Sequence, residues 1–399
     1  MNSPEKPLNY LNQLKRFFIH ERTYGGLLFI LLGHTLFRHI IIKLSHFINL
    51  DTLSFIGDIT PALYAIVYIF LLISTIIQWN KLNKLYINTF LIIFLISVIR
   101  EGIAFFNAES NYLLHNSILS GSALTSIKIT LPLLFLTVWI TIAETKELIN
   151  SFLSKLEVII LCNAILVVLG LIFGIIYFES YPSSGRWGYS GILPRGYHII
   201  FSSIFLIKCL SSTKLSPIKL SLLFIALVCS GTKAGLLSIA LIVFFVIFKS
   251  KKAQITFFGL SLIMIITFPK WIQEAVKYSS FWQQVYIDNG AWGTFFSLRN
   301  DKFFSLLEFV KTEYTTLNFL FGKANPESRI IVESLPVDYF VFFGITGTII
   351  LTYFFIKWLP NWKTATPLFI ASGGGWYMLT PFSFIVWVLW IEEEKRLKA

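Results

Sequence analysis

Basic side chains recur within and beside the long apolar stretches of this sequence, where charges are rare. Arg38, Arg100, Lys128 and Arg195 fall inside apolar stretches. A charge at membrane depth costs roughly 2.5 kcal/mol or more, so such a residue usually faces a bundle interior or an aqueous cavity. More basic residues stand in the polar segments: Arg186, Lys233, Arg299, Lys323 and Arg329. Guanidinium groups bind phosphate through paired hydrogen bonds and lysine binds it as a compact charge, so the set predicts a pocket for an anionic ligand.

Individual members of this set also fit plainer roles. Arg38 and Arg100 lie where a long side chain can reach the membrane interface, and Arg100 has Glu101 beside it. His198 follows Arg195 closely enough to join the same pocket, but a buried histidine with satisfied hydrogen bonds is the competing interpretation. The prediction of a site therefore depends on the set and not on one residue.

Two carboxylates near the end of the late polar interval, Glu333 and Asp338, are the candidates for a general base. Pairing of Asp338 with a nearby arginine is an equal alternative. The sequence has no Asp-x-Asp pair, no cluster of His, Cys and carboxylates at ligand spacing, and no phosphate-binding glycine loop. It therefore predicts no metal site and no cofactor, and it argues against a metal-dependent enzyme that uses a nucleotide-activated sugar.

The elements that must position these residues are apolar helices. Hydrophobic residues make up 55% of the 399-residue chain and charged residues only 14%, which a water-soluble globule of this size could not accommodate. A bilayer core takes roughly 20 helical residues to cross. Such stretches predict spans near 25–42, 59–78, 85–105, 117–140, 156–178, 190–210, 216–230, 234–248, 253–269 and 336–356, with two more in 365–390. The expected fold is a single all-α polytopic membrane domain over residues 1–399 with about twelve transmembrane helices.

The distribution of basic residues predicts the orientation. Short cytoplasmic loops carry an excess of Lys and Arg. One set of loops contains basic clusters such as Lys249, Lys251 and Lys252, whereas the short loops of the other set hold only Lys43, Arg186 and Lys233. Both termini are therefore expected in the cytoplasm, and the interval 270–335 is expected to form one large external loop. The net charge of +12 then follows largely from topology, and nothing in it predicts nucleic-acid binding.

The external interval has a pattern of its own. Phe303, Leu306, Leu307 and Val310 are spaced as one face of an amphipathic helix, expected near 300–321. Such a helix would lie on the mouth of the bundle or on the membrane surface, and a simple packing lid is the alternative. The interval is also rich in aromatic residues, which fit an interfacial belt or a surface for stacking sugar rings: Trp271, Tyr278, Trp282, Tyr286 and Trp292.

The layout and three local motifs resemble the bacterial O-antigen polymerase and O-antigen ligase superfamily. The first motif is Gly185–Gly191, which leads into an outer-facing span, and the second is the small-residue turn Ser230–Leu237 with its basic residue Lys233. The third runs through Ser297–Arg299, Phe321–Lys323, Glu333–Tyr339 and Gly344–Gly347. Ligases of the superfamily typically carry a histidine in the external loop, and 270–335 has none. The resemblance therefore favours the polymerase.

The resemblance implies a metal-independent glycosyltransferase of the bacterial inner membrane, with both termini cytoplasmic. Its substrate would be an oligosaccharide on undecaprenyl pyrophosphate, polymerised at the outer face into O-antigen or capsular polysaccharide. Membrane lipids and a chain-length regulator would be its other partners. Arg299, Asp338 and Glu333 would be catalytic, and the pyrophosphate or glycan would be bound by Arg186, Arg195, His198, Lys233, Lys323 and Arg329.

Two other functions remain open at this point. A ligase would transfer the glycan to a lipid A-core acceptor. A flippase of lipid-linked sugars would also need a cationic cavity, but transporters usually show related halves, and this sequence shows none.

Overall fold

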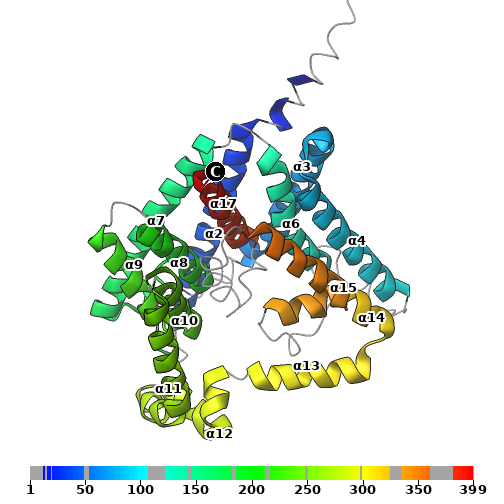
Figure 1. Ribbon diagram of the computed structural model, residues 1–399. Coiled ribbons are helices and arrows are strands. Elements are labelled where there is room, and N and C mark those ends of the chain that lie inside the picture. The colour runs from blue at the N-terminus through cyan, green and yellow to red at the C-terminus, as the bar shows by residue number, and fades with distance from the viewer. Residues whose placement is uncertain are drawn as a thin grey trace, which may run out of the picture.

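The structure is a computed structural model in which the chain forms a bundle of helices (Figure 1). It describes residues 12–13, 16–18, 20–48, 54–106, 122–141, 146–181, 186–211, 216–247, 250–296, 299–323, 335–359 and 381–398. Within these residues there is no β-strand, and an isolated β-bridge pairs Glu179 with Tyr189. The predicted all-α class is therefore confirmed.

The helices follow the apolar stretches in order. The first group is α2 (Glu21–Ile48), α3 (Ser54–Ile77), α4 (Lys84–Phe106), α6 (Ser122–Thr141), α7 (Lys146–Phe173), α8 (Arg195–Ser211), α9 (Pro217–Cys229) and α10 (Lys233–Ile242), which ends in a π-helical turn, Val243–Ile247. The second group is α11 (Lys251–Ala275), α12 (Ser280–Phe296), α13 (Arg299–Glu313), α14 (Thr316–Phe321), α15 (Leu335–Trp358) and α17 (Pro381–Lys398). Short 3₁₀ turns cover Trp79–Lys81, Ile176–Phe178 and Val276–Tyr278.

In the part of the chain that the structure describes, five helices are long and apolar enough to cross a bilayer: Arg22–Leu44, Ile59–Ile77, Lys84–Ala104, Asn150–Phe173 and Val337–Trp358. α11 is a sixth candidate if its two parts, which bend by 62°, count as one span. α9 and α10 have 13 and 10 residues. α9 extends about 20 Å, and α10 extends about 15 Å before the π-helical turn that continues it. Both lengths are short of a hydrocarbon core of about 30 Å. The described residues thus form a helical membrane protein with five or six candidate crossings. The predicted twelve crossings are not confirmed, and the part of 365–390 before Pro381 lies outside the described residues.

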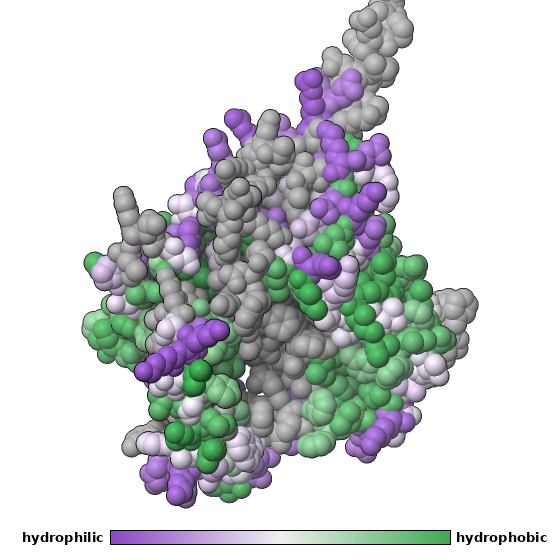
Figure 2. Space-filling view, in the orientation of Figure 1, coloured by the Kyte–Doolittle hydropathy of each residue, from purple (hydrophilic) through white to green (hydrophobic). Residues whose placement is uncertain are grey.

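The helices pack around two buried elements. α8 is buried from Gly196 to Ile207, and α17 packs against α6, α7 and α8 near the middle of the bundle (Figure 1). The outer helices instead expose large apolar side chains, such as Ile66, Ile266 and Ile356. Hydrophobic residues accordingly cover much of the flanks in Figure 2. Lipid tails can cover such a surface as well as protein can, so this arrangement fits a bundle in a bilayer.

The two ends of the bundle differ. In Figure 1 the start of α2 and the end of α17 lie at the upper end, and α12, α13 and α14 lie at the lower end. The described part of the interval 270–335 is therefore at the opposite end from the start of α2 and the end of α17. It contains the end of α11, α12, α13 and α14, so the described part of it is mostly helical.

The helix predicted near 300–321 is present as two helices. α13 ends at Glu313 and α14 begins at Thr316, because Thr315 and Asn318 form a capping box that starts a new helix. The buried apolar face also differs from the predicted one. Leu306 and Phe309 are buried, whereas Phe303 and Leu307 are exposed.

α15 is broken in its middle, and an arginine compensates for the break. Gly344 has φ 63° and ψ −170°, which interrupts the helix. Carbonyls just before a helix break lose their amide donors and need others, above all away from water. The Phe342 carbonyl accepts from Nη1 of Arg100 at 2.8 Å, and the Val341 carbonyl accepts from the Lys323 amide at 2.9 Å.

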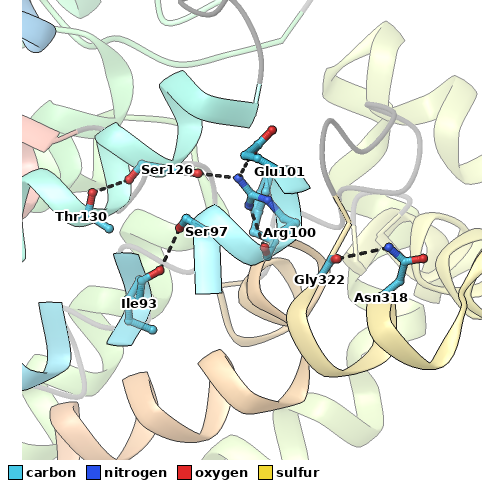
Figure 3. A network of polar contacts seen from close by, with 9 residues as sticks. Ile93, Ser97, Arg100, Glu101, Ser126, Thr130, Asn318 and Gly322 are labelled. Atoms are coloured by element: carbon cyan, nitrogen blue, oxygen red, sulfur yellow. Dashed lines mark hydrogen bonds and ion pairs between the residues drawn. The ribbon is translucent and has the colours of Figure 1, made fainter. Parts of the chain in front are cut away.

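Arg100 is buried, so its interpretation as a residue that reaches the interface is wrong. Its Nη2 donates to Glu101 at 2.6 Å and to the Ser126 hydroxyl, as Figure 3 shows. The side chain thus connects α4 with α6 and with the break in α15. This role could not be read from hydropathy, because it depends on where Gly344 interrupts another helix.

Replacing Arg100 with methionine is expected to destabilise the fold by about 1–3 kcal/mol, because the Phe342 carbonyl would be left buried without its donor. The measurement is thermal unfolding of the purified protein in detergent. Lys84→Met is the matched control, since Lys84 begins the same helix and is exposed. Equal melting temperatures for the two variants would contradict the assigned role of Arg100.

Candidate functional site

Two of the three sequence motifs pack directly on each other. The segment from Arg186 to Ser190 is non-helical, and the Tyr189 amide donates to the Cys229 carbonyl at 2.7 Å, next to the turn between α9 and α10. Gly188 and Gly231 make the close approach possible. A Cβ on Gly231 would lie 2.0 Å from the Trp187 carbonyl oxygen, and the φ of Gly231 is +64°. This contact brings the stretches that carry Arg186 and Lys233 together.

Side chains from two neighbouring helices fix the same segment. Lys43 of α2 is buried and donates to the Glu179 carbonyl at 3.3 Å, to the Ser190 hydroxyl at 3.4 Å and to the Gly191 carbonyl. Asn163 of α7 donates to the Ser190 carbonyl at 3.0 Å. Burial raises the pKa of Tyr189, and the nearby Glu179 adds to the effect, so its phenol stays neutral at physiological pH. The segment before α8 is thus held on several sides.

Three predicted site residues surround shared aromatic rings. The guanidinium carbon of Arg186 lies 3.7 Å from the ring centroid of Phe281 and 5.1 Å from that of Trp282. Both Arg186 and Arg195 approach Tyr181, at 5.0 and 4.4 Å. Lys233 lies 4.3 Å from the Trp282 ring. We refer to these residues as the basic–aromatic cluster: Tyr181, Arg186, Arg195, Lys233, Phe281 and Trp282.

Lys233 also holds α12 in place over this cluster. Its Nζ donates to the Phe295 carbonyl at 2.8 Å and to the Thr294 carbonyl, both in the last turn of α12. A cation at the C-terminus of a helix is stabilised by the free carbonyls there. The first turn of α12 carries Phe281 and Trp282. Because α12 is interrupted at Gly290 (φ 67°), its end contacts Lys233 while its start covers Arg186.

The cluster gathers three positive charges at one place. Cation–π contacts stabilise each cation without neutralising its charge. Two guanidinium groups and an ammonium suit a diphosphate, because the planar groups offer paired donors and the lysine a compact charge. The cluster therefore has the chemistry of an anion-binding site.

His198 is placed differently from the other candidates. It is fully buried in α8, its Nε2 lies 3.0 Å from the Ala226 carbonyl, and its Nδ1 lies 3.2 Å from Nδ2 of Asn163. Because a carbonyl only accepts, Nε2 carries the proton and Nδ1 accepts. The ring thus connects α7, α8 and α9, which corresponds to the structural alternative considered for this histidine.

The remaining candidates lie on the α13–α15 part of the structure. Lys323 forms an ion pair with Glu313 at 3.5 Å, and its Nζ lies 4.4 Å from the Phe309 ring. Asp338 is in the first turn of α15 and is 4% exposed. Arg299 begins α13, and the structure describes its backbone but not its side chain. Arg329 and Glu333 lie outside the described residues.

Sequence reasoning missed several residues that build this site. Tyr181, Phe281, Lys43 and Asn163 were not predicted to take part, and Trp282 was considered only as part of an aromatic belt or stacking surface. Lys43 did carry a signal, as a lysine at the end of an apolar stretch. Tyr181 and Phe281 carried none, because their role depends on the fold of α12 over the loop before α8.

Comparison with known proteins identified no similar protein. No protein-family model, no curated protein sequence and no solved structure matches this chain. Among the described residues no group of three or more His, Cys, Asp and Glu side chains could hold a metal ion. The fold and the site define the class as a helical membrane protein with a basic–aromatic cluster at one end of its helices.

Proposed function

We propose that this protein polymerises lipid-linked oligosaccharide repeat units at the outer face of a bacterial inner membrane. The observation that carries the proposal is the basic–aromatic cluster, where Arg186, Arg195 and Lys233 share the rings of Tyr181 and Trp282. The proposed donor carries its glycan on undecaprenyl pyrophosphate, whose negative charges match such a cluster. Twelve crossings and two cytoplasmic termini belong to the same proposal.

The proposed reaction is a glycosyl transfer. A sugar hydroxyl of one lipid-linked repeat unit attacks the anomeric carbon of the glycan on another. A new glycosidic bond forms, the bond from that carbon to the pyrophosphate oxygen breaks, and the pyrophosphate leaves with the electron pair. Arg186, Arg195 and Lys233 would stabilise the charge that develops on the leaving group.

The roles of the other candidates are part of the proposal as well. Arg299, Lys323 and Arg329 would meet further phosphate or sugar groups, and Asp338 or Glu333 would accept the proton of the attacking hydroxyl. His198 would support the site indirectly. It contacts Asn163, whose side chain also accepts a hydrogen bond from the Ile192 amide at 2.9 Å.

The glycan pattern of a deletion strain tests this function. Loss of the protein is expected to leave surface lipid with a single repeat unit, which defines a polymerase. A bare core with accumulated lipid-linked polymer would identify a ligase instead. Precursor retained in the inner leaflet would identify a flippase. Either of these two results would overturn the proposal.

The proposed orientation can be tested by cysteine labelling. Ser280 at the start of α12 and Asn83 between α3 and α4 are both exposed. In a background without the three native cysteines, Ser280→Cys is expected to react with an impermeant thiol reagent in intact cells, and Asn83→Cys only after permeabilisation. Labelling of Asn83→Cys in intact cells would reverse the orientation.

A further inference from the structure

The amphipathic unit α13–α14 leaves a second apolar face uncovered. Leu306 and Phe309 of α13 form an apolar cluster with Val341 of α15, and this contact accounts for the buried face of the helix. Phe303, Phe304 and Leu307 are exposed, with Phe304 66% exposed. At 100° per residue these three lie on one side of α13, next to the buried face. The opposite side carries exposed polar residues: Asp301, Ser305 and Thr312.

The contacts of α13 fix its depth relative to a membrane span. The candidate span in α15 begins at Val337. Val337 and Val341 are the residues of α15 that pack against α13 in this cluster. Both lie at the beginning of that span, so α13 packs against its start. Figure 1 shows α13 lying across the lower end of the bundle, between α12 and α14.

In the vertical direction of Figure 1, α14 lies closer to the middle of the bundle than α13. A Cβ on Gly344 would be 2.3 Å from the Leu320 carbonyl, so α14 touches α15 at Gly344. This position is seven residues after the first residue of the span, where α15 is interrupted. α14 also packs against α4, which contains another candidate span. Leu317, Phe319 and Leu320 of α14 are nevertheless exposed.

We infer that α13 and α14 are embedded in the lipid leaflet at this end of the protein, α13 at the boundary between headgroups and acyl chains and α14 among the acyl chains. Their occupant is the bilayer itself, because these helices pack on α4 and α15, which carry candidate spans, and their exposed apolar side chains continue the apolar surface of those spans. Lys311, next to this face, can extend its amine to the headgroups. This inference does not depend on the proposed function.

Fluorescence quenching in nanodiscs tests the inference. Cys162, Cys209 and Cys229 are first replaced by alanine. A polarity-sensitive fluorophore is then attached to Leu307→Cys or Phe303→Cys on the exposed apolar side of α13, or to Leu317→Cys on α14. Ser305→Cys is the matched control, because Ser305 lies on the polar side of the same helix and is exposed.

Labels at Leu307 and Phe303 are expected to emit at shorter wavelength than the label at Ser305. Nitroxides near the headgroups should quench them several times more strongly than the control, whereas aqueous iodide should preferentially quench the control. The Leu317 label should respond to a nitroxide midway along the acyl chain. Equal iodide quenching at Leu307, Phe303 and Ser305 would overturn the inference. Protection of the apolar positions from both quenchers would also overturn it and would indicate a protein covering this face.

Discussion

Arg186→Ala is expected to lower the rate of glycan polymerisation by about a hundredfold or more, because removing one preorganised donor to a developing charge typically costs on the order of 3 kcal/mol. Arg186 is the residue most enclosed by the cluster, with three aromatic rings within about 5 Å of its guanidinium carbon. Arg186→Lys is expected to be nearly as inactive. A lysine keeps the charge but loses the planar group that stacks on Phe281 and pairs with phosphate oxygens.

The assay uses purified protein in nanodiscs with a lipid-linked repeat unit, together with binding of inorganic pyrophosphate to the same samples. Arg22→Ala is the control, since Arg22 is exposed at the opposite end of the bundle. Retention of rate and pyrophosphate binding by a folded Arg186→Ala protein would show that the cluster anchors α12 and does not bind the donor.

The membrane class could be predicted from sequence because hydropathy sums transfer free energies along one segment, and that sum needs no knowledge of neighbours. Hydropathy alone does not distinguish α9 and α10 from spans, because their apolar stretches resemble those of spans although the helices are shorter. The length of an apolar run does not reveal where a turn between two helices, such as Ser230–Thr232, is fixed by contacts with another loop. The break in α15 is similar, since Gly344 lies against the backbone of Leu320 from a different helix.

The candidate site was predictable in part for the same reason. Charges in an apolar sequence are few and costly, so Arg186, Arg195 and Lys233 stood out without any structure. The aromatic residues around them did not, because aromatic side chains are abundant in this chain and their partners are chosen by the fold. The break between α13 and α14 did have a local signal, the capping pair Thr315 and Asn318.

Gly231→Ala is expected to prevent stable folding, with a cost above about 3 kcal/mol, because it combines two effects that are usually separate. The φ of +64° disfavours any residue with a Cβ by roughly 1–2 kcal/mol. The new Cβ would also lie 2.0 Å from the Trp187 carbonyl, so the two motifs could no longer touch. Fluorescence-detected size exclusion and melting temperature measure the outcome.

Substitutions at two other glycines separate the effect of backbone strain from the effect of the Cβ clash. Gly174 has φ +62° and Gly259 lies within α11, and neither has any atom within 4 Å of a Cβ built on it. Gly174→Ala should therefore cost roughly 1–2 kcal/mol from backbone strain alone, and Gly259→Ala should be neutral or stabilising by about 0.5–1 kcal/mol. The excess loss in Gly231→Ala over Gly174→Ala then measures the contact between the turn and Trp187. If the two variants melted at the same temperature, the contact that brings Lys233 beside Arg186 would be absent in the folded protein, and the anion-binding cluster would have no structural basis.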